Sequence, residues 1–178
     1  MSQNKLSLRD ICLVGIFVAK IVAISQLAIP LAGGVPITLQ TFVIPFTGAV
    51  LGAKRGALAA LIYVLLGAAG LPVFAHFQGG LHVILGPTGG YILSYPLMAF
   101  IAGFFADKNN RPLLALGLFF GFAVCLAIGM LQFALILGHD LQTAFLLAVA
   151  PFIPVEALKM AAVFITAPII RNLYNTRR

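Results

Sequence analysis

Two ionisable residues near the C-terminal end of the chain have the type and spacing to form a binding site. Glu156 and Lys159 are three residues apart, so they share one face of a helix. Pro154 suits the first turn of that helix, where its missing N–H costs nothing and the helix dipole favours a carboxylate. Ionisable groups at membrane depth are costly and usually functional, so we expect the pair to bind a ligand. The alternative is that the two residues neutralise each other in an ion pair that contributes to packing and binds no ligand.

The second candidate feature is an uncharged connection, rich in glycine and proline, from Leu71 to Tyr91. It lies within a run from Gly56 to Ala106 that contains no Lys, Arg, Asp or Glu. One membrane span needs only about 20 apolar residues, so this run predicts two spans with a connection between them. Backbone of this kind cannot face lipid, because its N–H and C=O groups would lack partners. We expect it to close a pocket as a lid.

Position and hydrogen-bonding capacity select further candidates for ligand contacts. Gln40 lies near the start of the second predicted span, whereas Gln78 and Thr88 lie in the lid. The glycine pair Gly79 and Gly80 would let the backbone turn and approach a bound molecule closely. We therefore expect all five residues to surround a small ligand.

Composition indicates an integral membrane protein. The chain of 178 residues is 62% hydrophobic and 8% charged, with a mean hydropathy of +1.11, whereas about a quarter of the residues in a soluble domain are charged. This length fits a single domain. The net charge of +7 does not indicate nucleic-acid binding, because the basic residues separate apolar runs instead of forming one patch. Cys12 and Cys125 both fall inside apolar runs, where we expect inert packing residues.

The apolar runs predict an all-α membrane protein with six transmembrane helices in the lipid bilayer. Prolines, glycines and charged turns separate the runs, and the lid joins the third to the fourth. The six runs cover about residues 10–28, 37–52, 56–69, 90–106, 112–137 and 154–170.

Two further segments need an interpretation. Residues 141–153 form an apolar approach to the last span, broken by Pro151. Residues 1–25 also resemble a signal peptide. We favour a retained first helix, because Lys20 interrupts the apolar core.

The basic residues orient the predicted helices. Of the 11 Lys and Arg residues, all but Lys20 and Lys159 lie at the two termini or in the turns at 52–56 and 107–111. Six spans put these four segments on one side, and the opposite connections hold no Lys or Arg. The positive-inside rule then places both termini in the cytoplasm, the chain in the cytoplasmic (inner) membrane, and the lid on the outer face.

The first predicted helix carries small residues at every fourth position: Gly15, Ala19 and Ala23. Such a stripe lets another helix approach closely, within this chain or in a partner. Lys20 lies near mid-depth on the same helix. We expect it to reach the cavity, to pair with a group such as Gln40, or to make an interhelical contact without a direct role.

No motif indicates catalysis, a metal or a cofactor. The chain lacks G-x-x-x-x-G-K-[ST] and H-E-x-x-H, and no Ser/His/Asp set has sequence support. The histidines His76, His82 and His139 fall in the outward connections without the spacing of metal ligands, so we expect polar loop residues. We therefore expect a protein that is not an enzyme.

The order of several motifs closely resembles the BioY family. V-P-I-T-L-Q-T begins at Val35, L-G-A-K-R-G at Leu51, G-L-P-V-F-A at Gly70 and L-G-P-T-G-G-Y at Leu85; P-x-E-x-x-K covers Pro154–Lys159. BioY proteins are the biotin-specific substrate-binding (S) components of energy-coupling-factor (ECF) transporters. The resemblance implies six helices, cytoplasmic termini, tight binding of biotin, and an outward pocket closed by the loops between helices one and two and between helices three and four.

The resemblance also implies partners and site residues. Small residues of the first helix would dock on a transmembrane coupling protein that carries two ATPase subunits, so the chain needs no nucleotide motif of its own. Glu156, Lys159 and Tyr91 match the family's site. The carboxylate would accept the ureido N–H groups of biotin, the ammonium would donate to the ureido C=O, and Tyr91 or the lid backbone would bind the biotin carboxylate.

Two features depart from the family pattern. The family's lid is usually richer in glycine where this chain has His76, Phe77 and Gln78, and its acid is more usually Asp, so Glu156 adds one methylene. The alternatives to biotin capture are an S component for a different vitamin, a self-sufficient secondary transporter or channel, and an intramembrane enzyme.

Overall fold

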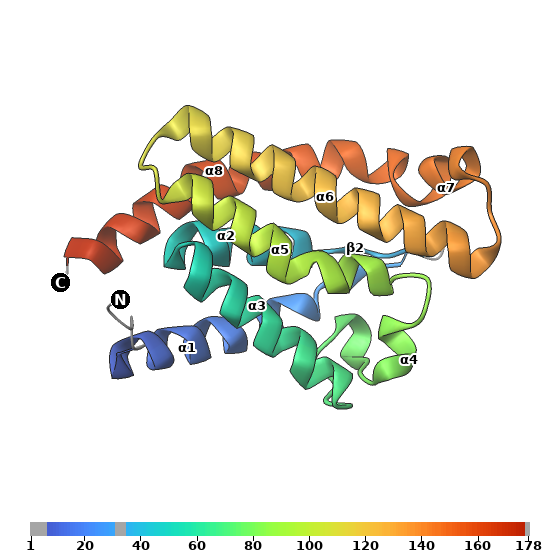
Figure 1. Cartoon of the computed structure of the whole chain (residues 1–178), viewed down its shortest axis with the longest axis horizontal. Helices are drawn as coiled ribbons and strands as arrows, with labels where there is room; N and C mark the ends of the chain where they lie inside the picture. The colour runs from blue at the N-terminus through green and yellow to red at the C-terminus, as the bar shows by residue number, and fades with distance from the viewer. Residues whose placement is uncertain (1–6, 31–34, 177–178) are drawn as a thin grey trace, which may run out of the picture.

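The computed structural model of the chain describes residues 7–30 and 35–176. Over these residues six long helices form the body of the molecule (Figure 1). They are α1 (Leu8–Ser25), α2 (Gln40–Leu51), α3 (Ala53–Ala68), α5 (Gly89–Ala106), α6 (Arg111–Leu137) and α8 (Ile153–Thr176). Each overlaps one of the six predicted runs, which confirms the all-α fold. Of the basic residues at the two termini, Lys5, Arg177 and Arg178 lie outside the described residues, as do residues 31–34 of the predicted connection between the first two helices.

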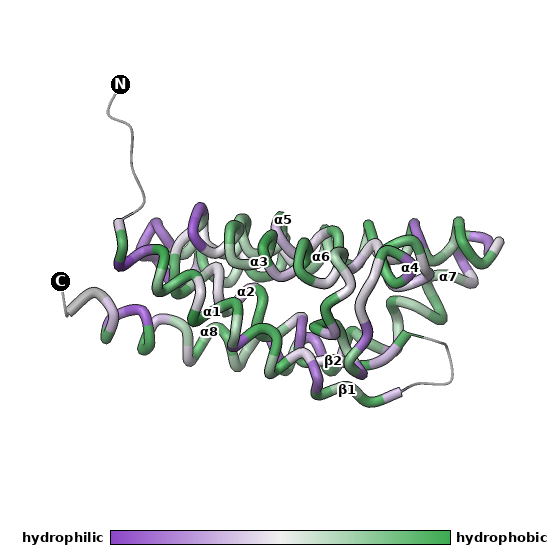
Figure 2. Tube along the Cα trace, turned by 90° about the horizontal axis from the view of Figure 1, so that it is seen from below, coloured by the Kyte–Doolittle hydropathy of each residue, from purple (hydrophilic) through white to green (hydrophobic). Residues whose placement is uncertain are grey.

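The helices form two layers, visible in Figure 2. α3, α5 and α6 make one layer and α2 and α8 make the other (Figure 2), and α1 lies at one edge of the molecule beside α3 (Figure 1). By length and composition alone, three helical segments of the described chain can cross a membrane: Gly89–Ala106, Arg111–Leu137 and Leu141–Tyr174. α2 is apolar but shorter, and α1 carries Arg9, Asp10 and Lys20.

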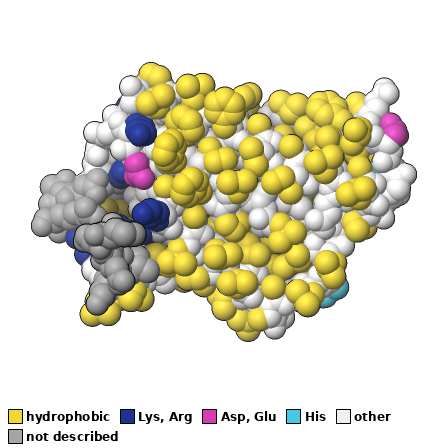
Figure 3. Space-filling model, in the orientation of Figure 1, with side chains coloured by type: hydrophobic (Ala, Val, Ile, Leu, Met, Phe, Trp, Pro, Cys, Tyr) yellow, Lys and Arg dark blue, Asp and Glu magenta, His cyan; other side chains and the backbone are white. Residues whose placement is uncertain are grey.

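The surface has the charge distribution that the sequence predicts. On the face shown in Figure 3, hydrophobic side chains cover the middle of the molecule, whereas Lys and Arg gather at the end where both termini lie. Arg171 ties helices together at this end. It contacts Asp107 at 2.7 Å and the Ala49 carbonyl at 3.0 Å, and the Asp107 carboxylate accepts the backbone N–H of Ala53 at 3.1 Å.

Short elements toward the opposite end were not predicted. The strands β1 (Ala28–Ile29) and β2 (Ile37–Thr38) form an antiparallel hairpin, with Ala28 opposite Thr38, so the second helix begins at Gln40 and not at residue 37. The lid contains a 3₁₀ turn, η1 (Ala75–Phe77), and one turn of helix, α4 (Leu81–Ile84).

The apolar approach to the last helix is also ordered. It forms α7 (Leu141–Ala148) and a second 3₁₀ turn, η2 (Ala150–Phe152), which contains Pro151. Asp140 caps α7 by accepting the backbone N–H groups of Gln142 and Thr143 at 3.1 and 3.2 Å. Hydrogen bonds from Thr143 hold the pKa of this exposed carboxyl below its ordinary value.

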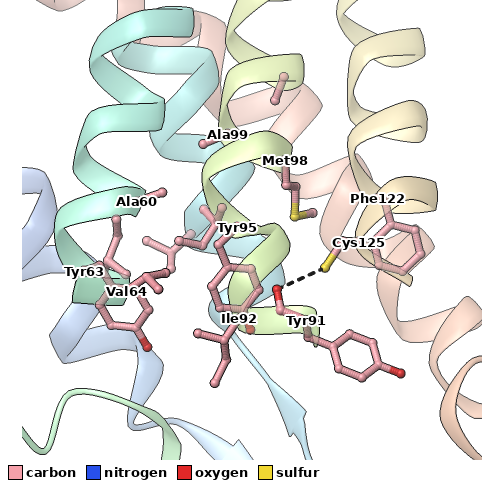
Figure 4. Packing of buried hydrophobic residues seen from close by; sticks show 14 of the residues in the cluster. Ala60, Tyr63, Val64, Tyr91, Ile92, Tyr95, Met98, Ala99, Phe122 and Cys125 are labelled. Atoms are coloured by element: carbon pink, nitrogen blue, oxygen red, sulfur yellow. Dashed lines mark hydrogen bonds between the residues drawn. The ribbon is translucent and has the colours of Figure 1, made fainter. Parts of the chain in front are cut away.

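α5 is the central helix and packs most extensively against α6, α2 and α3. Figure 4 shows its residues Tyr91, Ile92 and Tyr95 between Tyr63 of α3 and Phe122 of α6. Cys125 is buried in this core as expected, whereas Cys12 is exposed on α1, so its predicted packing role is wrong.

Glycines allow the helices to approach closely where they cross. Gly48 of α2 lies directly against the backbone of Ala99 in α5, so a methyl group at residue 48 would overlap the Ala99 carbonyl. Helices in lipid gain no hydrophobic driving force from association, and they depend on such close contact. The α2–α5 crossing therefore requires glycine at this position.

We expect Gly48→Ala to lower the melting temperature of the purified protein in detergent. Overpacking costs about 1–3 kcal/mol, which outweighs the gain in helix propensity of about 1 kcal/mol. Gly15→Ala is the matched control, because a methyl group at Gly15 on exposed α1 would meet no atom within 4 Å. Equal melting temperatures for Gly48→Ala and the parent would contradict this packing.

Candidate functional site

A cavity of about 340 Å³ lies beneath the lid, between the hairpin, the first turns of α2, α5 and α8, and the middle of α6. Its walls are largely apolar and aromatic, with a few polar groups, which is typical of a small-molecule site. The aromatic residues on its wall are Tyr91, Tyr95, Phe122 and Phe152. The polar residues on its wall are Thr38, Gln40, Thr41, His76, Gln78, Thr88 and Glu156.

Glu156 lies at the base of this cavity, and Lys159 lies directly behind it and pairs with it, as their helical spacing predicts. The side chains of Glu156 and Lys159 are 4% and 7% exposed, and Lys159 Nζ lies 2.6 Å from Glu156 Oε1. Lys159 also donates to the Thr38 carbonyl at 2.6 Å and to Thr41 Oγ1 at 3.0 Å. An ammonium has three N–H donors, so acceptors of the protein occupy all of them. Lys159 is not among the residues that line the cavity, and its three donors are bound to Glu156, Thr41 and Thr38 instead of facing a ligand.

The two oxygens of Glu156 have different surroundings. Oε1 accepts from Lys159 and, at 2.7 Å, from the Thr41 hydroxyl. Oε2 is buried without a hydrogen-bond partner among the described residues, although Glu156 lines the cavity. A buried carboxylate oxygen without a donor is strongly unfavourable. The base of the cavity is therefore suited to a ligand that presents an N–H donor.

Gln40 belongs to a buried chain of hydrogen bonds next to this carboxylate. Its Nε2 donates to the Tyr63 hydroxyl at 2.7 Å, and its Oε1 accepts from the Tyr95 hydroxyl at 3.2 Å. The Gln40 side chain is thus held in one orientation. Since an amide nitrogen has two N–H donors, one remains for a ligand.

Tyr91 lines the cavity with its ring, but its hydroxyl donates to the Ala148 carbonyl at 2.6 Å. This bond ties the start of α5 to the end of α7. The hydroxyl hydrogen is therefore bonded within the protein. It is not directed toward a ligand, contrary to the prediction that Tyr91 would donate to the biotin carboxylate.

The lid residues divide into two groups. Gln78 and Thr88 line the cavity, and their contact with a ligand stays a prediction. Gly79 and Gly80 do not: Gly79 packs on the backbone of Leu71, and the Gly80 N–H donates to the Gly67 carbonyl at 2.7 Å. The glycine pair thus joins the lid to the end of α3 instead of approaching a ligand.

Gln26, at the end of α1, holds the lid and was not predicted. Its Oε1 accepts the backbone N–H of Phe77 at 2.8 Å, and its Nε2 donates to the Val73 carbonyl at 3.2 Å. The contact joins segments far apart in the chain, so no local pattern could have revealed it. Thr38 and Thr41 were also missed, although they flank Gln40 in a single motif.

α1 presents its predicted stripe outward. Gly15, Ala19 and Ala23 are all exposed, so no other helix of the described chain covers them. Lys20 is also exposed, with its ammonium 4.6 Å from the centre of the Phe17 ring. It neither reaches the cavity nor pairs with Gln40, so these two expectations for Lys20 are wrong.

Comparisons with known proteins agree with this geometry. A sequence model described as the BioY family matches residues 1–176. The chain belongs to the BioY family. It is 42% identical over 159 residues to the "Probable biotin transporter BioY" of Pyrococcus horikoshii, covering 89% of this chain and 94% of that protein. It is 40% identical over 169 residues to the "Biotin transporter BioY" of Thermotoga maritima, covering 93% of this chain and 98% of that protein.

A solved structure has the same fold as this BioY protein. It is described as the S-component for biotin from an ECF-type ABC transporter. The two chains share 27% sequence identity with a TM-score of 0.85, covering 98% of this chain and 95% of the other. The predicted S-component fold is thereby confirmed.

We expect Lys159→Met to destabilise the ligand-free protein by about 3–5 kcal/mol, because it leaves the buried Glu156 carboxylate without its cation. The double variant Glu156→Leu/Lys159→Met should recover most of this loss, because no buried charge remains. Melting temperatures of the parent, the two single variants and the double variant complete the cycle. Additive losses would contradict a coupled pair.

Proposed function

We propose that this chain is the membrane-embedded S component that captures biotin at the outer face for ATP-driven uptake by an ECF transporter. The names of the matched relatives and the fold of the solved S-component support this proposal. The observation that carries it is the buried, unpartnered Oε2 of Glu156 at the base of the cavity.

The chemistry of biotin fits the cavity from its base upward. The ureido ring presents two N–H donors, of which Glu156 Oε2 can accept one or both. Hydrogen bonds to an ionised acceptor are the stronger kind, so a buried carboxylate suits this ring. Lys159 contributes by holding Glu156 in its ionised form and in one orientation. The remaining N–H of Gln40 is the donor that we assign to the ureido C=O.

The other parts of biotin require apolar surroundings. Ile92, Phe122, Leu126 and Phe152 line the same cavity and would surround the thiophane ring and the valeryl chain. The lid, held by Gln26, would then cover the ligand. Capture needs no covalent step, so we assign no catalytic residue and propose that the chain is not an enzyme.

Uptake requires partners, because the sequence contains no nucleotide-binding motif. We propose a transmembrane coupling protein with two ATPase subunits, docked on the exposed stripe of Gly15, Ala19 and Ala23. The concentration of basic residues at one end supports insertion in the cytoplasmic membrane with both termini inside.

We expect Glu156→Gln to weaken biotin binding about 100-fold or more, measured by isothermal titration of the purified protein. The amide oxygen would face Lys159, so the amide N–H₂ would replace Oε2 and oppose the ureido N–H donors. Hydrogen bonds to charged groups contribute about 1.5–3 kcal/mol, and an opposed donor adds to the loss.

Lys20→Gln is the control for this measurement, because Lys20 is exposed outside the cavity and its replacement should leave affinity unchanged. Titration of the parent with other vitamins tests the alternative ligand class. Glu156→Gln binding biotin within threefold of the parent would contradict the assignment of Glu156.

We expect Gly15→Leu to abolish biotin uptake by cells that also produce the coupling protein and ATPases, without changing the affinity of the purified protein for biotin. The added side chain would separate α1 from a partner helix. Leu116→Ala is a control on exposed α6, far from the stripe, and should transport normally. Full uptake by Gly15→Leu would refute docking on this stripe, and uptake in cells lacking the partners would favour a secondary transporter.

A further inference from the structure

The proposed function leaves one end of biotin without a partner. With the ureido ring at Glu156, the valeryl chain leads away from the base of the cavity, and its terminal carboxylate needs a cation or several donors. The lid lines the cavity at two places: at the 3₁₀ turn η1 and the residue after it, with Ala75, His76 and Gln78, and farther along the chain at Val83, Thr88 and Tyr91.

Among the described residues on the cavity wall, His76 is the one side chain that can carry a positive charge. Lys159 is behind Glu156 with its three donors occupied. Residues 31–34, which lie outside the described part of the chain, are Leu, Ala, Gly and Gly, and none of these side chains can carry a positive charge.

The backbone of His76 provides an independent indication. His76 has φ 56° and ψ 32°, and Phe77 has φ 57°, so two successive non-glycine residues are left-handed. Left-handed backbone is unfavourable for residues with a side chain, and strain of this kind collects at functional sites. Phe77 is 71% exposed and does not line the cavity, whereas His76 does. The conformation of η1 thus places His76 at the edge of the cavity.

The Gln26 side chain maintains this conformation through its 2.8 Å bond to the Phe77 N–H. The other titratable groups on the cavity wall are Glu156, Tyr91 and Tyr95. Glu156 is the one acid among them, and its negative charge disfavours an anionic ligand group at the base of the cavity. An anionic ligand group is therefore placed best at the lid.

We propose that His76 is a specificity-determining residue that recognises the carboxylate end of the ligand at the lid. This inference rests on the proposed capture of biotin. Because His76 is exposed at the edge of the cavity, solvent screens the interaction. Screened pairs contribute up to about 1 kcal/mol, which corresponds to about fivefold in affinity.

The test compares two ligands that differ only at this end: biotin, and biotinamide, in which a neutral primary amide replaces the carboxylate. We expect the parent to prefer biotin by about three- to fivefold in titrations of the purified protein. His76→Asn should lose this preference while binding biotinamide as the parent does, because Asn tolerates left-handed backbone and is neutral. His76→Arg, with a permanent charge, should increase the preference.

Two matched variants separate charge recognition from lid structure. Phe77→Gly relieves the same backbone strain outside the cavity, and His82→Gln removes an exposed lid imidazole that does not line it. Both should keep the parental ratio of the two affinities. A parental ratio in His76→Asn, or an equal loss for both ligands, would overturn the role of His76. Failure of the parent to bind either ligand would instead refute the proposed function.

Discussion

The ion pair between Glu156 and Lys159 is the constraint on which the rest of the site depends. A carboxylate and an ammonium are costly inside a membrane protein unless each is paired and hydrogen-bonded. Here the ammonium is fully satisfied and the carboxylate is satisfied on one oxygen only. The protein thus stabilises the charge of its acid and keeps one acceptor for a ligand.

The surrounding elements follow from this requirement. Thr38 and Thr41 come from the junction of β2 and α2, so the hairpin and the first turn of α2 must lie against the start of α8. Gly48 permits the close approach of α2 to α5. α5 then places Tyr91 and Tyr95 on the cavity wall. The hydrogen bonds around Glu156 and Lys159 and the close helix crossings together specify one arrangement of the helices. Apolar packing alone would be less specific.

Much of the fold could be predicted from sequence, because the apolar runs are long and the charges are confined to their ends. The short elements could not: strands of two residues, such as Ala28–Ile29, have no periodicity to detect. The pairing of Glu156 with Lys159 follows from helical spacing, but spacing cannot tell which group faces the cavity. Gly79 and Gly80 were correctly placed in the lid and wrongly assigned to the ligand, because a glycine can approach a neighbouring backbone equally well.

The two hydrogen bonds that Gln26 makes with Val73 and Phe77 join the end of α1 to the lid of the cavity. The same helix carries the exposed small residues on its outer surface. A protein that bound α1 and displaced its last turn would have to stretch or break these two hydrogen bonds. Binding on the outer surface of the bundle would then affect the lid over the cavity. By thermodynamic linkage, a ligand that stabilised the closed lid would in turn change the affinity of such a protein for α1. Gln26 would thereby couple the occupancy of the cavity to the binding of a protein on α1.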